Sequence, residues 1–183
     1  MNFAQATQQE NFILSYKDLN DKTGFIKAQI KTIFYLTSQK KDFDSDIEKQ
    51  EFAEKWLMPY LDQFPEYTLV SIDKNNVVSG YLTGCPDTSN AMNTLNFNYM
   101  TLFQHLYQNY PAHFHINVHP NYQGKGIGKQ LVHHFEDCLK PLNIKGTHIV
   151  THPKALNINF YKKTGYVNTE SQTENYFFMG KKL

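Results

Sequence analysis

The feature that constrains this chain most is a glycine-rich run at residues 118–128, which reads Val-His-Pro-Asn-Tyr-Gln-Gly-Lys-Gly-Ile-Gly. Gly124, Gly126 and Gly128 alternate with other residues, directly after an apolar strand pattern and directly before a helical one. Glycine permits positive φ and lets a ligand approach the backbone. Amides that lead into a helix N-terminus favour anions, because they lack intrahelical partners and the helix dipole is positive there. The run therefore predicts a strand–loop–helix unit that cradles a phosphate or pyrophosphate, with a ligand-free turn as the alternative.

The spacing of the glycines excludes two familiar nucleotide loops. A P-loop needs four residues between its glycines and a hydroxyl residue after the lysine, whereas three residues separate Gly124 from Gly128 and Gln130 follows Lys129. A dinucleotide fingerprint needs G-x-G-x-x-G, and this chain has G-x-G-x-G. The pattern that fits is Q/R-x-x-G-x-G/A, starting at Gln123. This run resembles the acetyl-CoA pyrophosphate loop of the GNAT N-acetyltransferase family.

That resemblance implies a set of residues that contact acetyl-CoA. The loop amides would bind the pyrophosphate, with help from the Gln123 side chain, while Lys125 and Lys129 would add charge or be ordinary surface lysines. The strand before the loop would pair with the pantetheine arm. Seven residues before the tyrosine discussed below, the family often has an asparagine where this chain has Lys154, so Asn157 or Asn159 would have to replace that contact. The full set of expected cofactor contacts is Ile116, Val118, Gln123, Gly124, Lys125, Gly126, Ile127, Gly128, Lys129, Asn157 and Asn159.

The strand at 112–119 supplies the candidate base. Its alternate residues are apolar on one face, while His113, His115, Asn117 and His119 lie on the other. A polar face on a central strand suggests a wet cavity, since such strands are usually apolar on both faces. We expect His115 to take the proton of an ammonium group, because imidazole titrates near neutral pH. The alternative is that His113 and His115 are hydrogen-bonding residues at a sheet end.

Tyr161 is the candidate acid. Residues 160–166 read Phe-Tyr-Lys-Lys-Thr-Gly-Tyr and resemble the F-Y-x-x-x-G-F/Y ending of the helix on the CoA side in the family. The matched Tyr161 would protonate the departing CoA thiolate, because a phenol of pKa ~10 can donate to a thiolate of pKa near 8.5. The alternative is that Phe160 and Tyr161 are core aromatics of a short amphipathic helix.

Hydrophobic periodicity predicts an α/β order of elements that matches the GNAT fold. The resemblance to that family therefore implies a mixed sheet of six to seven strands flanked by helices. A capping box at Ser45 and Glu48 opens the second helix. One stretch departs from the family: between the third and fourth strands, about 85–111, apolar residues from Leu95 to Tyr110 predict an extra helix that packs on the sheet or walls the acceptor pocket. The predicted strands are 11–16, 67–73, 76–83, 112–119, 146–151, 165–170 and 174–180, and the predicted helices lie at 22–36, after Ser45, after the glycine run and after Pro153.

Bulk properties narrow the function further. The length of 183 residues suits one domain at 1–183, and a net charge of +1 with interspersed signs gives no reason to expect nucleic acid or an anionic membrane as partner. We see no signal peptide and no apolar run near the ~18 residues that span a bilayer. Cys85 and Cys138 are far apart, which favours reduced thiols in a cytoplasmic protein. The eight histidines complete no zinc-like set, so we expect no metal.

We therefore expect an acetyl-CoA-dependent N-acetyltransferase of the acyltransferase class, which acts on a small-molecule or peptide primary amine by direct attack in a ternary complex. The second hypothesis is a CoA-binding domain without catalysis that serves as a sensor or scaffold. Residues 115–117 and the long connection before them also resemble the acetyltransferase-like domain that accompanies some O-GlcNAc hydrolases. The sequence leaves the acceptor open and is compatible with a homodimer.

Overall fold

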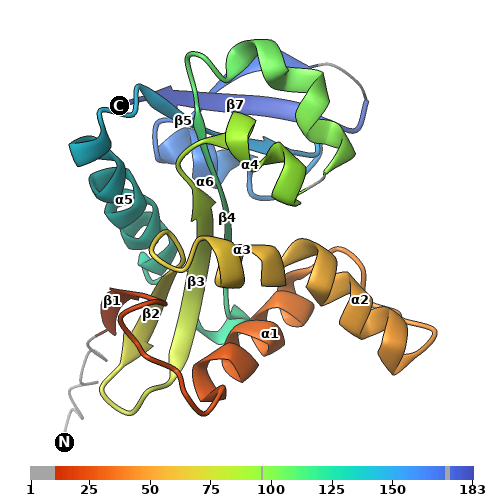
Figure 1. Ribbon diagram of the computed structural model, residues 1–183, viewed down its shortest axis with the longest axis vertical. Helices are drawn as coiled ribbons and strands as arrows, with labels where there is room; N and C mark the ends of the chain where they lie inside the picture. The colour runs from red at the N-terminus through yellow and green to blue at the C-terminus, as the bar shows by residue number, and fades with distance from the viewer. Residues whose placement is uncertain (1–10, 96, 172–173) are drawn as a thin grey trace, which may run out of the picture.

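The chain forms one twisted sheet of seven strands in the order β1-β2-β3-β4-β5-β7-β6. The structure is a computed structural model that describes residues 11–95, 97–171 and 174–183, and it confirms the expected α/β architecture with a mixed sheet flanked by helices (Figure 1). Every strand pair is antiparallel except β4 with β5. The strands are β1 Asn11–Ser15, β2 Leu69–Asp73, β3 Val78–Cys85, β4 Ala112–Val118, β5 Gly146–Thr151, β6 Val167–Ser171 and β7 Phe177–Lys182.

Helices cover both faces of the sheet. The α-helices are α1 Phe25–Thr37, α2 Asp46–Trp56, α3 Met58–Gln63, α4 Thr88–Leu95, α5 Ile127–Leu139 and α6 Ile158–Lys163, and the 3₁₀ turns are η1 Asn98–Leu106, η2 Pro120–Tyr122 and η3 Lys140–Leu142. Figure 1 shows α5 on one side of β2–β4 and α1 with α2 and α3 on the other. No helix among the described residues is long and apolar enough to cross a membrane.

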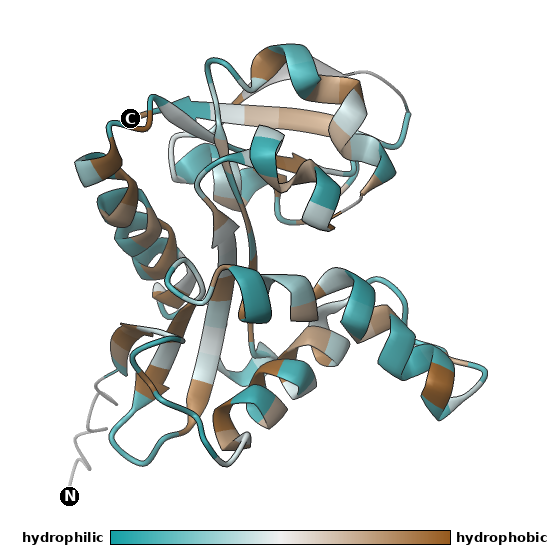
Figure 2. Ribbon diagram, in the orientation of Figure 1, coloured by the Kyte–Doolittle hydropathy of each residue, from teal (hydrophilic) through white to brown (hydrophobic). Residues whose placement is uncertain are grey.

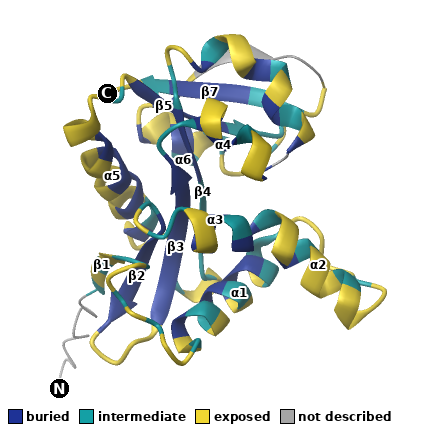
Figure 3. Ribbon diagram, in the orientation of Figure 1, coloured by how far each residue is buried: buried dark blue, intermediate teal, exposed yellow. Residues whose placement is uncertain are grey.

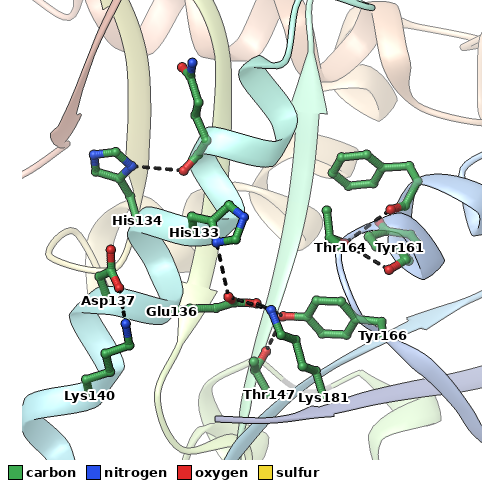
Figure 4. Close-up of polar contacts among 12 residues, drawn as sticks. His133, His134, Glu136, Asp137, Lys140, Thr147, Tyr161, Thr164, Tyr166 and Lys181 are labelled. Carbon is green, nitrogen blue, oxygen red and sulfur yellow. Dashed lines mark hydrogen bonds and ion pairs between the residues drawn. The ribbon is translucent and has the colours of Figure 1, made fainter.

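Helix α5 packs its apolar stripe on β2, β3 and β4. Leu131 and Phe135 from α5 meet Leu82 and Phe114 in the largest buried cluster. The Phe135 ring lies over Gly84, where a Cβ would come within 2.2 Å of Cε2, so only glycine allows this approach. At the C-terminal end of α5, buried Glu136 accepts two hydrogen bonds of 2.8 Å from Lys181 of β7 (Figure 4). This pair joins α5 to the far half of the sheet.

Helices α1 and α3 pack on the opposite face of β2 and β3, and α2 projects away from the sheet. Ser45 Oγ accepts from the Glu48 amide at 3.1 Å, which confirms the expected start of α2. Pro59 stands in the first turn of α3, so the chain turns between Trp56 and Met58 and starts a new helix there. Helix α2 is mostly hydrophilic (Figure 2) and exposed (Figure 3), with Ala53 as its buried residue.

The insert between β3 and β4 differs from the single α-helix that the sequence predicts. It consists of α4 followed by the 3₁₀ helix η1, and Asn96 between them lies outside the described residues. Phe97, Met100 and Phe103 are all buried, and their spacing of three residues matches the three residues per turn of a 3₁₀ helix. Burial of every third residue therefore favours a 3₁₀ helix over an α-helix in this segment. The insert still packs on the sheet, as expected, because Phe103 and Tyr107 contact Phe178 of β7.

Candidate functional site

The candidate site is a cavity of about 540 Å³ that opens where β4 and β5 separate. These two strands pair in parallel at only two positions, Ala112 with Thr147 and His113 with His148. Beyond them, His115, Ile116 and Asn117 of β4 line the cavity from one side and Val150 and Thr151 of β5 from the other. The cavity therefore lies against backbone of β4 that β5 does not pair.

The glycine-rich loop has the geometry that its sequence predicts. Gly124 and Gly126 have φ of 77° and 84°, a left-handed conformation that side chains rarely adopt. Gly126 is the N-cap of α5 and brings no side chain to the first helical amides. Gly128 serves another purpose: a Cβ there would lie 3.2 Å from the Phe160 ring, so the glycine lets α5 and α6 approach each other. The first turn of a helix thus points open amides out of the loop.

The loop residues that are expected to contact the cofactor include three exposed side chains and one buried side chain. The side chains of Gln123, Lys125 and Lys129 are exposed around the loop. Gln123 donates one amide hydrogen to the Val118 carbonyl at 3.0 Å, so it also ties the loop to the end of β4. The Lys125 ammonium lies 5.0 Å from the centre of the Tyr122 ring. Ile127 is buried in the core under the loop, so any contact it offers to a ligand comes from its backbone.

Tyr161 lies inside the cavity wall near Ile116. It is 5% exposed and packs against Phe114, while its hydroxyl accepts from Asn157 Nδ2 at 3.4 Å. Burial raises the pKa of Tyr161 above its ordinary value, so the hydroxyl stays protonated. Asn157 also lines the cavity, and Asn159 is exposed on α6. Of the two asparagines, Asn157 is the one that the structure places beside the expected acid.

His115 reaches the cavity from the polar face of β4, as the alternation predicts. Its Nε2 lies 3.1 Å from the hydroxyl of Tyr60, and that hydroxyl lies 2.7 Å from Nε2 of His113. His113 Nδ1 lies 2.7 Å from Thr88 Oγ1, which in turn lies 2.6 Å from the carbonyl of Pro111. The four side chains form one hydrogen-bonded row from Thr88 at the start of α4 to His115 in the cavity lining.

The end of this row fixes the direction of every hydrogen bond in it. The Pro111 carbonyl only accepts, so the Thr88 hydroxyl donates to it and must accept from His113 Nδ1–H. His113 is neutral, because burial holds its pKa well below the ordinary value, and its Nε2 accepts from the Tyr60 hydroxyl. The Tyr60 oxygen then accepts from His115 Nε2–H. His115 is thereby held in the Nε2–H tautomer, and Nδ1 carries the free lone pair.

The electrostatics of His115 differ from the expectation of an imidazole that titrates near neutral pH. Burial lowers the pKa of His115 to about 4, so the ring is neutral at neutral pH. A neutral imidazole can accept a proton but is a weaker base than free histidine. His115 can therefore take a proton only from a nitrogen that is itself becoming acidic.

Several residues of the site were not assigned to it from the sequence. Trp56 and Tyr60 share the apolar stripe of one predicted helix, which favours a core role for both. In the structure Trp56 lines the cavity and Tyr60 holds two histidines. Tyr99 and Tyr176 also line the cavity, from η1 and from the segment before β7. The spacing of four residues between Trp56 and Tyr60 indicates that both lie on one face of a helix. No local sequence pattern indicates that Tyr60 contacts β4.

No group of three or more His, Cys, Asp or Glu within the described ranges is placed to hold a metal ion. Cys85 is buried and its thiol donates to the Asp87 carbonyl at 3.3 Å, while burial raises its pKa to about 12. This thiol is therefore protonated and is no nucleophile at neutral pH.

Comparison with known proteins places this geometry in a family. The family model described as the acetyltransferase (GNAT) domain matches residues 66–168, which is more than half of the chain. Among solved structures, SsHAT superposes with a TM-score of 0.74 at 18% identity, over 94% of this chain and 98% of that one. The paia N-acetyltransferase from Thermoplasma acidophilum, solved in complex with coenzyme A, gives a TM-score of 0.58 at 18% identity, over 95% and 99%. The yncA protein from Salmonella typhimurium, solved with its cofactor acetyl-CoA, gives 0.57 at 18%, over 94% of both chains.

The buried histidines of this region predict a specific loss of stability in acid. His113, His115 and His148 are neutral when folded, because burial lowers the pKa of each, to about 4 for His115 and about 3 for His148. Below pH 6.5 these three histidines bind protons in the unfolded chain, whereas in the folded chain they stay neutral until the pH approaches their lowered pKa values. Stability is therefore full above pH 6.5 and falls below it, by about 1.4 kcal/mol per pH unit for each histidine until its folded pKa is reached.

Urea unfolding between pH 7.5 and 5.5 measures this slope. We expect His148→Asn, which keeps a donor for the Tyr110 carbonyl, to reduce the slope by about one third. His134→Asn on the exposed face of α5 is the control and leaves it unchanged. An equal slope in the wild-type protein and His148→Asn contradicts the assignment.

Proposed function

The chain belongs to the GNAT acetyltransferase family, and from this premise we propose that it is an acetyl-CoA-dependent N-acetyltransferase. It transfers the acetyl group to a primary amine by direct attack in a ternary complex. One observation carries the proposal: Tyr161 and His115 border one cavity beside the unpaired edge of β4, and the open amides of the glycine loop follow the end of that strand. The binding of coenzyme A by the Thermoplasma acidophilum protein and of acetyl-CoA by yncA supports the choice of donor.

The residues present fit acetyl-CoA. Amides of residues 124–128 at the start of α5 would hold the pyrophosphate, because two left-handed glycines aim them outward and the helix dipole favours anions. Ile116 and Val118 would offer backbone to the pantetheine arm, since β5 pairs β4 only at its first two residues. When bound, acetyl-CoA supplies the acetyl group as a thioester. The open edge of β4 thus orients the donor toward the cavity.

Tyr161 and His115 complete the proton balance of the transfer. The amine nitrogen forms a bond to the acetyl carbon while the carbon–sulfur bond breaks. Nitrogen loses basicity as that bond forms, so the neutral His115 Nδ1 can take its proton although the pKa of this imidazole is low. The protonated hydroxyl of Tyr161 donates to the departing sulfur. The two side chains border the same cavity, so both protons move inside it.

The state of the two cysteines bears on the cellular location that we propose. Cys85 is buried and Cys138 is exposed, and both are free thiols. This supports a reducing, cytoplasmic location. The resemblance to the acetyltransferase-like domain of some O-GlcNAc hydrolases, and a homodimer, stay predictions.

Thiol release from acetyl-CoA in the presence of a panel of primary amines tests the activity. We expect release that depends on both the amine and the enzyme, with the acetylated amine identified by mass. Saturable CoA binding without release for any amine would instead favour the sensor or scaffold hypothesis.

Gly126→Asp tests the loop. Aspartate tolerates the left-handed conformation of this N-cap, but its carboxylate would face the pyrophosphate. We expect the dissociation constant of CoA to rise by at least about 100-fold, because a charge-assisted anion site becomes repulsive. Calorimetric titration measures it.

Gly24→Asp is the matched control for that variant. Gly24 is also a glycine N-cap with positive φ and open space, at the start of α1. The Gly24→Asp variant should unfold at the same temperature as Gly126→Asp and bind CoA like the wild-type protein. Normal binding by Gly126→Asp would remove the loop from the donor site.

Tyr161→Phe tests the acid. The substitution keeps the ring in its packing and removes the donor, so we expect kcat to fall by about 10²-fold with the CoA dissociation constant unchanged. Tyr166→Phe is the control, because this neighbouring buried tyrosine bonds Glu136 and Thr147 outside the cavity. An unchanged kcat for Tyr161→Phe would leave its hydroxyl without a catalytic role.

Tyr60→Phe tests whether the hydrogen-bonded row positions the base. Without the hydroxyl, His115 loses the acceptor that holds its tautomer. We expect kcat to fall by about 10-fold with an unchanged KM for acetyl-CoA, because a positioned base contributes about 10²- to 10⁴-fold and misorientation removes part of that contribution. Tyr107→Phe also removes one buried hydrogen bond, to Met100, and should leave kcat unchanged. Equal effects of the two substitutions would show that Tyr60 is only structural.

A further inference from the structure

We infer that the acceptor is a small primary monoamine with a flat aromatic body, and not a polyamine or an aminoglycoside. The inference rests on the proposed function and names the substrate class of the same cavity. It follows from the side chains that line the cavity together with His115.

Aromatic rings make up much of this wall. Trp56 from α2, Tyr99 from η1 and Tyr176 before β7 line it together with Phe34, Phe52 and Tyr81. Trp56 and Tyr99 are nearly parallel, with an interplanar angle of 3° and ring centres 6.5 Å apart. A cavity wall rich in aromatic rings favours a ligand with a flat ring, since offset or edge-to-face ring contacts add to the burial of the apolar surface.

Buried packing holds these rings in place. Phe97 stacks on Trp56 at 4.5 Å and on Tyr99 at 5.7 Å, and it is itself 3% exposed. Tyr99 also stacks on Tyr176 at 5.7 Å. The rings come from three separate segments, so the wall is preorganised and loses little freedom when a ligand binds.

The charge of the cavity lining also favours a monoamine as the acceptor. No Asp, Glu, Lys or Arg lines the cavity in the part of the chain that the structure describes. A polyamine or aminoglycoside would bring several ammonium groups into this space without a carboxylate to compensate for their lost hydration. A monoamine brings one nitrogen, and His115 in the cavity lining can receive it.

The base and the size of the cavity agree with this choice. Burial keeps the pKa of His115 low, so the imidazole suits an amine that enters uncharged. The volume of about 540 Å³ lies within the range of small-molecule pockets.

Trp56 provides a direct test, because it is the only tryptophan of the chain and lines the cavity. Its emission is followed during titration of the CoA-bound protein with phenethylamine, cyclohexylethylamine and spermidine. The first two share charge and length and differ in whether the ring is flat. We expect phenethylamine to saturate the signal, cyclohexylethylamine to bind several-fold more weakly, and spermidine to give no saturable change.

Tyr99→Leu and Phe25→Leu form the matched pair of variants. Tyr99→Leu should weaken phenethylamine binding by about 10-fold and leave CoA binding unchanged, because one stacking face is lost. Phe25 is an aromatic residue on the surface at the start of α1, so Phe25→Leu should change neither. Thermal unfolding of both variants checks that they fold.

The outcomes separate this inference from the proposed function. Saturable spermidine binding at lower concentration than phenethylamine, no binding of phenethylamine, or an unchanged affinity in Tyr99→Leu each overturns the acceptor class. Thiol release with spermidine and none with phenethylamine would leave the acetyltransferase standing and remove the aromatic acceptor. Phenethylamine binding without thiol release from any amine would keep the acceptor site and remove the catalytic function.

Discussion

The site depends on the separation of β4 from β5, which occurs after only two paired residues. β4 stays bonded to β3 from Cys85–His113 to Gly80–Val118, while β5 stays bonded to β7 along its whole length. Among the described residues, the strand pairing between the two halves of the sheet is therefore limited to Ala112 with Thr147 and His113 with His148. Backbone groups of a buried strand need partners, so an edge opened in mid-sheet is a ready place for an extended ligand arm. The glycine loop lies at the end of this edge, where the first turn of α5 offers its amides to an anion.

The separation of β4 from β5 also explains how the two histidines on the polar face of β4 differ in burial and hydrogen bonding. At the closed end of the opening, His113 is fully enclosed and can satisfy its ring nitrogens only through Thr88 and Tyr60. Two residues further along, His115 has one nitrogen in this row and borders the cavity with the rest of the ring. Burial therefore decreases along the strand toward the cavity. The enclosed histidine holds a tautomer, and the half-buried one can exchange a proton with a guest.

Local rules predict much of this arrangement from the sequence. The positive φ of Gly124 and Gly126, the capping of α2 by Ser45 and the opposite faces of His115 and Ile116 all depend on near neighbours in the chain. The partners of the histidines do not. Tyr60 is 55 residues from His115, and it reaches β4 only because the chain turns at Leu57 and starts α3. The pKa values of His115 and Tyr161 were likewise expected near those of solvated side chains, since a sequence carries no measure of their burial. The 3₁₀ winding of η1 was missed because residues Leu95 to Tyr110 fit the helical period of 3.6 as well as Phe97, Met100 and Phe103 fit a period of three.

Burial favours the neutral form of His115, Tyr161, Tyr81 and Tyr99, which all line the cavity. It lowers the pKa of His115 and raises the pKa of Tyr161 and Tyr81, and no formally charged side chain among the described residues adds to the lining. Fixed charge is instead concentrated outside, at the loop, where Lys125 and Lys129 are exposed beside the start of α5. The protein thus separates two tasks in space. In the proposed reaction, charge attraction selects the anionic donor at the surface, and the neutral interior receives the acceptor as an uncharged amine.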